Sequence, residues 1–75
     1  MRERVIEVMA NVFAVEKEAI TEDVALGKFK GWDSLRHMSL VLALEEEFGL
    51  RFDDDEVPNL ISFKLILHAL EARVG

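Results

Sequence analysis

Ser34 and His37 are the pair of residues in this 75-residue chain whose types and spacing could support nucleophilic chemistry. Three residues apart on a helix, a serine hydroxyl and an imidazole lie on neighbouring turns, where they could act as nucleophile and base. No second acid is evidently placed to orient His37, and so short a chain offers no convincing substrate cleft. A small hydrolase is therefore the weaker hypothesis, and His37 is expected at the surface or in contact with a loop.

Ser34 follows Asp33, a residue type that commonly caps helices. A capping carboxylate accepts backbone N–H groups of the first turn that would otherwise be unpaired. Such N–H groups and the helix dipole also favour an anion, so a phosphate esterified to Ser34 would be stabilised there. A serine at this position usually does no more than start a helix. The residues alone leave both interpretations open.

The helix that must position Ser34 is predicted over residues 34–48, with Gly49 as its C-terminal stop. It carries two apolar stripes on opposite sides. The stripe expected to face the core consists of Leu40, Val41, Leu44 and Phe48. The second stripe consists of Leu35, Met38 and Leu42. Because only one face of a helix in a small bundle points inward, the second stripe is either covered by a loop or exposed as a docking surface.

The elements around this helix predict an all-α fold. Apolar residues recur at spacings of three and four between Arg2 and Ala14, which indicates a first helix. A long loop over residues 15–32 follows, and Trp32 is expected to anchor it to the bundle. Ser62 is a plausible cap for a last helix that runs to about Arg73.

Residues 54–59 can form only a short helix or a 3₁₀-like turn, because Pro58 stands inside them. The expected architecture is a small bundle of three main helices plus one short helix or turn, with a long loop between the first and second main helices and no strand. Residues 1–75 are expected to form a single domain with a small core.

Charge and composition exclude several classes of function. The whole net charge of −6 lies in residues 45–56, which hold seven acids and one base. Such a patch repels nucleic acid and anionic lipid and attracts basic partners. The acidic run from Asp53 to Glu56 could suggest a calcium-binding site, but it lacks the ligand spacing of an EF-hand loop.

The absence of cysteine excludes disulfides, thiolate catalysis and cysteine-based metal sites. We expect no metal site, since two histidines are too few for most metal constellations. No apolar run is long enough to span a bilayer and the first residues lack a signal-peptide core, so a cytoplasmic location is expected.

The segment Gly31-Trp32-Asp33-Ser34-Leu35, followed by Leu42-Ala43-Leu44-Glu45-Glu46-Glu47-Phe48, resembles the acyl carrier proteins, whose signature is Asp-Ser-Leu at the head of an acidic helix. The resemblance covers essentially the whole chain in length and helix order. It implies that Ser34, flanked by Asp33 and Leu35, receives a 4′-phosphopantetheine arm from coenzyme A. A separate, magnesium-dependent phosphopantetheinyl transferase would attach it. Acyl or aminoacyl groups would ride as thioesters on the arm, and the carrier itself, expected to be a monomer, would catalyse nothing.

The resemblance also implies a partner surface. Loading enzymes and downstream acyl-transfer enzymes would dock with basic patches, while the second stripe makes the apolar contact. The acids expected to meet those patches are Glu45, Glu46, Glu47, Asp54 and Glu56. A bundle of this type can also shelter a short acyl chain between its helices.

The chain departs from the fatty-acid-synthesis members of that family in the first turns after the serine. Arg36 and His37 follow Leu35, and Ser39 stands where a second acid is usual. We therefore expect a specialised carrier of a dedicated pathway, with Arg36 taking part in partner choice. The remaining alternative is a non-catalytic interaction module, which explains the two-striped helix but gives Ser34 no role.

Overall fold

Three α-helices and two short 3₁₀ helices make up the computed structural model, which describes residues 1–74. The helices are α1 (Arg2–Phe13), α2 (Ser34–Phe48) and α3 (Phe63–Val74), and the 3₁₀ helices are η1 (Lys17–Ala19) and η2 (Val57–Asn59). Within the described residues the only extended pairing is an isolated bridge between Ala25 and Ser62. The predicted all-α fold with a long first loop is confirmed.

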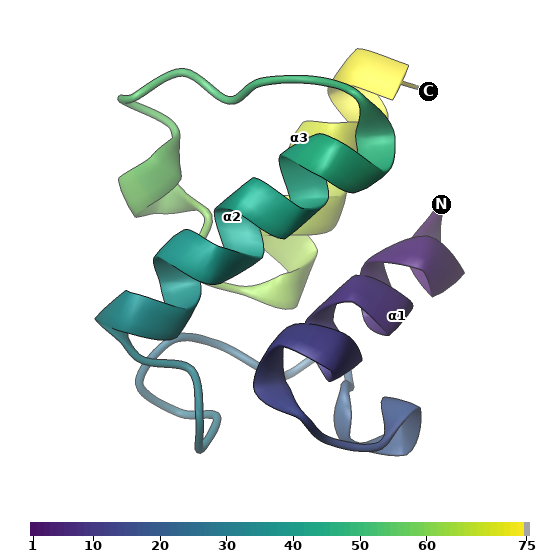
Figure 1. Ribbon diagram of the computed structural model, residues 1–75, viewed down its shortest axis with the longest axis vertical. Helices are drawn as coiled ribbons and strands as arrows, with labels where there is room; N and C mark the ends of the chain where they lie inside the picture. The colour runs from purple at the N-terminus through teal and green to yellow at the C-terminus, as the bar shows by residue number, and fades with distance from the viewer. Residues whose placement is uncertain (75) are drawn as a thin grey trace.

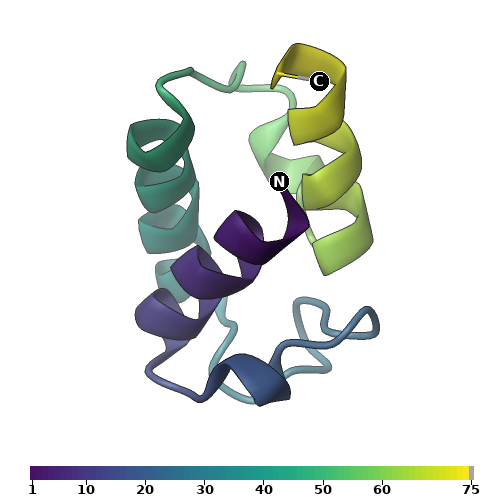
Figure 2. The same cartoon turned by 90° about the vertical axis from the view of Figure 1, so that its right-hand side faces the viewer.

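The helices surround a core that is closed at one end by the long loop. α1 packs against α2, and α3 lies behind α2 in Figure 1, so that the three helices form a bundle with α1 in front of the other two in Figure 2. The loop over residues 14–33 crosses the end of the bundle where α2 begins, and both views show the chain termini toward the opposite end. Ser34 therefore stands where the loop meets the bundle.

The ends of α1 and α2 follow from local signals. α1 stops at Phe13, one residue earlier than predicted, because Ala14 takes a left-handed conformation with φ of 58° and donates its N–H to the Ala10 carbonyl. α2 ends as predicted at Gly49, whose φ of 64° is readily adopted by glycine.

The long loop is held by its own apolar side chains and by the start of α3. Ile20, Val24 and Trp32 are buried. The Leu26 N–H donates to the Ile61 carbonyl over 2.8 Å, and the Phe63 N–H donates to the Val24 carbonyl over 3.1 Å. Loop residues therefore complete the core at this end, as predicted. No pattern in the sequence predicts η1 within the loop.

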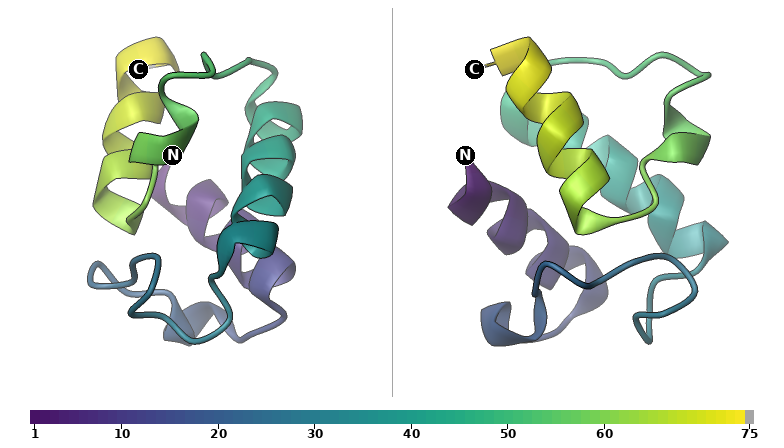
Figure 3. Two further views of the ribbon diagram at one scale, coloured as in Figure 1. Left: turned by 90° about the vertical axis from the view of Figure 1, so that its left-hand side faces the viewer. Right: turned by 180° about the vertical axis from the view of Figure 1, so that it is seen from behind.

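The segment between α2 and α3 carries η2 beside α2 (Figure 3). Pro58 is the second residue of η2, where its missing N–H breaks no helical hydrogen bond. Ser62 caps α3, because its Oγ accepts the Leu65 N–H over 3.1 Å. The expected short turn and the expected cap are both confirmed.

All four residues of the predicted core stripe of α2 lie in the core or pack against it. Leu40 and Leu44 have no exposed surface and Val41 is 4% exposed. Phe48 is only half-buried, because it lies at the rim of the core with the Arg4 guanidinium 4.5 Å above its ring. Phe48 therefore packs against the core as predicted, but it is only partly covered. No helix in the described part of the chain is long and apolar enough to cross a membrane.

Candidate functional site

Ser34 is the first residue of α2 and its side chain is exposed. Asp33 caps the helix as predicted: its Oδ1 accepts the Arg36 N–H over 2.8 Å, and its backbone carbonyl accepts the His37 N–H over 2.8 Å. The N–H groups of Ser34 and Leu35 precede the first helical hydrogen bond and remain available. An anionic ester on Ser34 would meet these two donors and the positive end of the helix dipole.

His37, one turn after Ser34, is buried with 7% of its surface exposed. The Trp32 indole Nε1–H donates to His37 Nδ1 over 3.1 Å, and His37 Nε2 lies 2.9 Å from the Val57 carbonyl oxygen. An indole N–H only donates and a carbonyl only accepts, so Nδ1 carries no proton and Nε2 carries one. We call this contact of Trp32, His37 and Val57 the clasp.

The clasp removes His37 from the chemistry of Ser34. Both imidazole nitrogens are already bonded, and neither can take the proton of the Ser34 hydroxyl without breaking a buried hydrogen bond. The expected loop contact of His37 is confirmed through Trp32, whereas a surface position is wrong. The side chain follows the spacing of the core stripe, with Leu40, Val41 and Leu44 at three, four and seven residues beyond it. That spacing was the signal that the sequence prediction did not use.

Trp32 anchors the loop as predicted and is 2% exposed. Its ring lies 5.4 Å from the ring of Phe13 and is stacked 6.0 Å from the ring of His37, measured between centroids. Phe29 extends the group, 5.4 Å from Phe13. These aromatic contacts fix the residues immediately before Ser34 against α1 and α2.

The second stripe of α2 is open to solvent. Leu35 is 79% exposed, Met38 52% and Leu42 59%. The alternative in which the long loop covers this stripe is therefore wrong, because the loop packs under the end of the bundle instead. Three large apolar side chains in a row on one helix form a patch of the kind that marks a partner site.

The predicted acidic residues fall into two groups. Glu46 and Asp54 are exposed and make no side-chain ion pair within residues 1–74. The other three have internal partners. Glu45 accepts the Phe52 N–H over 2.9 Å, Glu47 pairs with Arg4 over 3.0 Å, and Glu56 pairs with Arg73.

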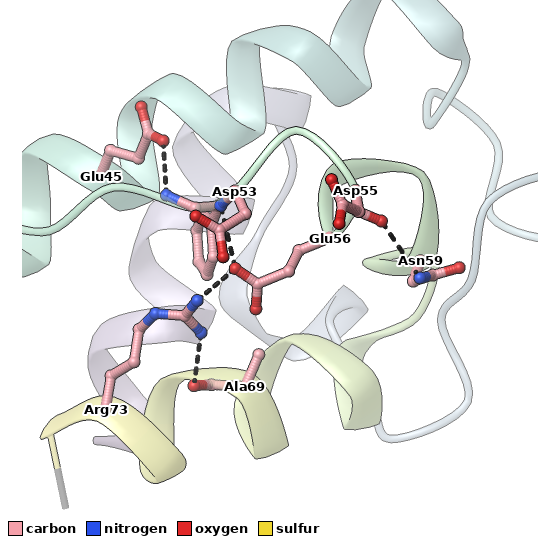
Figure 4. Close-up of polar contacts among 8 residues, drawn as sticks. Glu45, Asp53, Asp55, Glu56, Asn59, Ala69 and Arg73 are labelled. Carbon is pink, nitrogen blue, oxygen red and sulfur yellow. Dashed lines mark hydrogen bonds and ion pairs between the residues drawn. The ribbon is translucent and has the colours of Figure 1, made fainter.

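Glu56 belongs to a small polar cluster that joins the turn before η2 to the end of α3. Its carboxylate faces the Arg73 guanidinium, which also donates to the Ala69 carbonyl (Figure 4). The hydrogen bond from the Asp53 N–H and that from Arg73 hold the pKa of Glu56 below its ordinary value of 4.5. Glu56 thus has a structural role, and its predicted partner contact would compete with that role.

Arg36 is exposed but does not extend freely into solvent. Its Nη1 donates over 3.3 Å to the carbonyl of Val12, one of the last carbonyls of α1 that have no partner within the helix. The contact links the start of α2 to the end of α1. Its proposed role in partner choice stays a prediction. In residues 1–74 no three His, Asp or Glu side chains gather closely enough to hold a metal ion.

An exposed serine at a helix start, without an available base, is suited to modification by another enzyme, as in a carrier domain. Comparison with known proteins agrees. The family model for the phosphopantetheine attachment site matches residues 3–71. The chain is 36% identical over 69 residues to an acyl carrier protein of Campylobacter hominis, covering 92% of this chain and 87% of that protein. It is 33% identical over 70 residues to an acyl carrier protein of Syntrophobacter fumaroxidans, covering 93% and 86% respectively.

The chain therefore belongs to the acyl carrier protein family. Members of this family carry a covalently attached 4′-phosphopantetheine group and are not enzymes. They interact with phosphopantetheinyl transferases and with enzymes that handle acyl groups. The exposed hydroxyl and available N–H groups at the start of α2 fit such a phosphodiester.

Proposed function

We propose that Ser34 is the residue that receives 4′-phosphopantetheine and that the chain carries acyl or aminoacyl groups on it. The observation that supports the proposal most strongly is the position of Ser34, exposed at the capped N-terminus of α2 with N–H donors beside it. In the transfer, Ser34 Oγ forms a bond to the phosphorus that bears the pantetheine, the pyrophosphate bond of coenzyme A breaks, and 3′,5′-adenosine diphosphate leaves. The hydroxyl proton passes to a base of the transferase, since His37 is unavailable. When bound, the group supplies a thiol that holds the cargo as a thioester.

Two exposed serines on α2 allow a matched test of the attachment residue. Ser34 and Ser39 both lie on the surface of the same helix, five residues apart. After incubation with coenzyme A, magnesium and a promiscuous phosphopantetheinyl transferase, wild type and Ser39→Ala should each gain one phosphopantetheine group by intact mass. Ser34→Ala should gain none. A modified Ser34→Ala protein would refute the assignment.

The second stripe together with the exposed acids is proposed as the partner surface. Leu35, Met38 and Leu42 offer the apolar contact, and Glu46 and Asp54 offer charges without internal partners. Basic patches on loading and acyl-transfer enzymes complement such a surface, and the charges would act mainly on the rate of encounter. Glu45, Glu47 and Glu56 belong to the same proposal, although each also has an internal partner.

A dedicated pathway, rather than general fatty-acid synthesis, is proposed on the residues that follow Ser34. Arg36 puts a positive charge two residues after the attachment position, and a partner that presents arginine or lysine there would meet like charge. A single domain over residues 1–75, a monomeric state and a cytoplasmic location complete the proposal.

The alternative of a pure interaction module accounts for the apolar face but not for a modifiable serine. The mass test separates the two, because an interaction module would remain unmodified under conditions in which a carrier is loaded.

A further inference from the structure

The clasp lies one turn beyond Ser34 on α2, where the buried His37 side chain contacts Trp32 and Val57. We propose that the contact of Trp32, His37 and Val57 keeps the carried group outside the bundle, so that an alkyl chain attached at Ser34 is not sheltered in the core. The inference rests on the proposed attachment at Ser34.

The position of the clasp follows from helical spacing. Ser34 and His37 are three residues apart on α2 and therefore share one side of the helix. A chain attached at Ser34 that turned inward along α2 would meet His37 first. The hydrogen bond from His37 to the Val57 carbonyl joins α2 to η2 at this point, and the two elements lie side by side in Figure 3.

Opening the clasp would leave buried polar groups without partners. Within the described residues every buried side-chain nitrogen and oxygen has a hydrogen-bond partner. An alkyl chain that separated Trp32 from His37 would leave the indole N–H and the imidazole nitrogen unpaired, and an alkyl chain offers neither of them a replacement. The free energy gained by burying the CH₂ groups of the chain would be offset by the cost of these unpaired polar groups.

The space behind the clasp is already filled. Leu40, Leu44 and Ile66 have no exposed surface, and the aromatic rings of Phe13 and Trp32 pack at 5.4 Å. Close-packed cores open only at the cost of existing contacts. Surface hollows of about 390, 350 and 270 Å³ lie along α1, and none is lined by Ser34 or His37. A tethered group at Ser34 is thus directed to solvent or to the partner enzyme.

The test compares two loaded forms of the full chain. A promiscuous transferase is supplied with acetyl-coenzyme A or octanoyl-coenzyme A, and intact mass confirms the product. Two signals are then compared between the acetyl and octanoyl forms. They are the methyl resonances of Leu40, Leu44 and Ile66 and the emission of Trp32, the only tryptophan in the chain. We expect both signals to be the same in the two forms. Shifts of the core methyl groups or of the Trp32 emission that occur only with octanoyl would overturn the inference.

Two variants test whether the clasp is the cause. His37→Ala removes both of its hydrogen bonds, and we expect an octanoyl-dependent shift of the core methyl groups in this variant. Trp32→Phe removes only the donated N–H and keeps an aromatic ring, so it serves if His37→Ala does not fold. Ser39→Ala on the same helix is the control and should behave as wild type. Absence of an octanoyl effect in a folded variant would refute the role of the clasp. Failure to load any form would instead refute attachment at Ser34 and the inference with it.

Discussion

Replacing Leu44 by alanine should destabilise the protein severely, because this side chain lies at the centre of the α2 core stripe. Leu44 has no exposed surface. Truncation of a buried leucine costs about 2–5 kcal/mol, from lost transfer free energy and from the cavity that remains. A domain of 75 residues is stable by roughly 4–11 kcal/mol, so the change removes a large part of the free energy of unfolding. The thermal midpoint should fall by at least about 10 °C.

Leu42→Ala is the matched control, since it makes the same chemical change two residues away on the same helix. Leu42 is 59% exposed, and its truncation should cost less than about 1 kcal/mol. Urea denaturation followed by circular dichroism measures both free energies of unfolding. If Leu42→Ala proves the more damaging of the two, or the two costs are equal, the assignment of the core and outward faces of α2 is refuted.

Three further predictions address the surface. Below pH 4.5, the free energy of unfolding of wild type should fall more steeply than that of Glu56→Gln. The pKa of Glu56 is lower in the folded protein than in the unfolded chain. The stability that the Glu56 carboxylate contributes is therefore fully present above the pKa of the unfolded state, and it is lost as the pH falls through the pKa of the folded state. Parallel curves from urea melts across pH would contradict this. Leu42→Ala should raise the KM of an acyl-transfer partner for the loaded carrier, and an unchanged KM would count against a docking role of the second stripe. Arg36→Asp should raise kcat/KM with a generic ketosynthase while changing stability by less than about 0.5 kcal/mol. Equal kcat/KM values would refute a role of Arg36 in partner choice.

Local signals in the sequence were sufficient for most of the fold. Asp33, Gly49 and Ser62 act through backbone groups within a few residues, so their capping roles could be read from residue type and position. The partial exposure of Phe48 could not be predicted from residue type and position. It depends on how another helix covers the end of α2, where Arg4 of α1 lies over the Phe48 ring. η1 spans three residues, too few for a periodic pattern.

The candidate site was predictable in its exposed part and not in its buried part. The second stripe follows from helical spacing, although its exposure depended on where the long loop packs. The sequence predicts His37 at the surface or against a loop once a catalytic role is set aside, whereas its burial requires a partner for each ring nitrogen. Those partners, Trp32 and Val57, come from two other segments. Arg36 and Glu56 also have partners that are distant in sequence, Val12 at 24 residues and Arg73 at 17 residues.

The most direct test of the central claim is to locate the modification on the loaded protein. Trypsin cleaves after lysine and arginine, so cleavage after Lys30, Arg36, Arg51 and Lys64 places the three serines of the chain in three different peptides. Tandem mass spectrometry of the digest should find phosphopantetheine on the peptide of residues 31–36, attached to Ser34. The peptides that contain Ser39 and Ser62 should be unmodified. Phosphopantetheine on either of those peptides, or on no peptide after treatment with an active transferase, would contradict the claim that Ser34 is the attachment residue of this carrier.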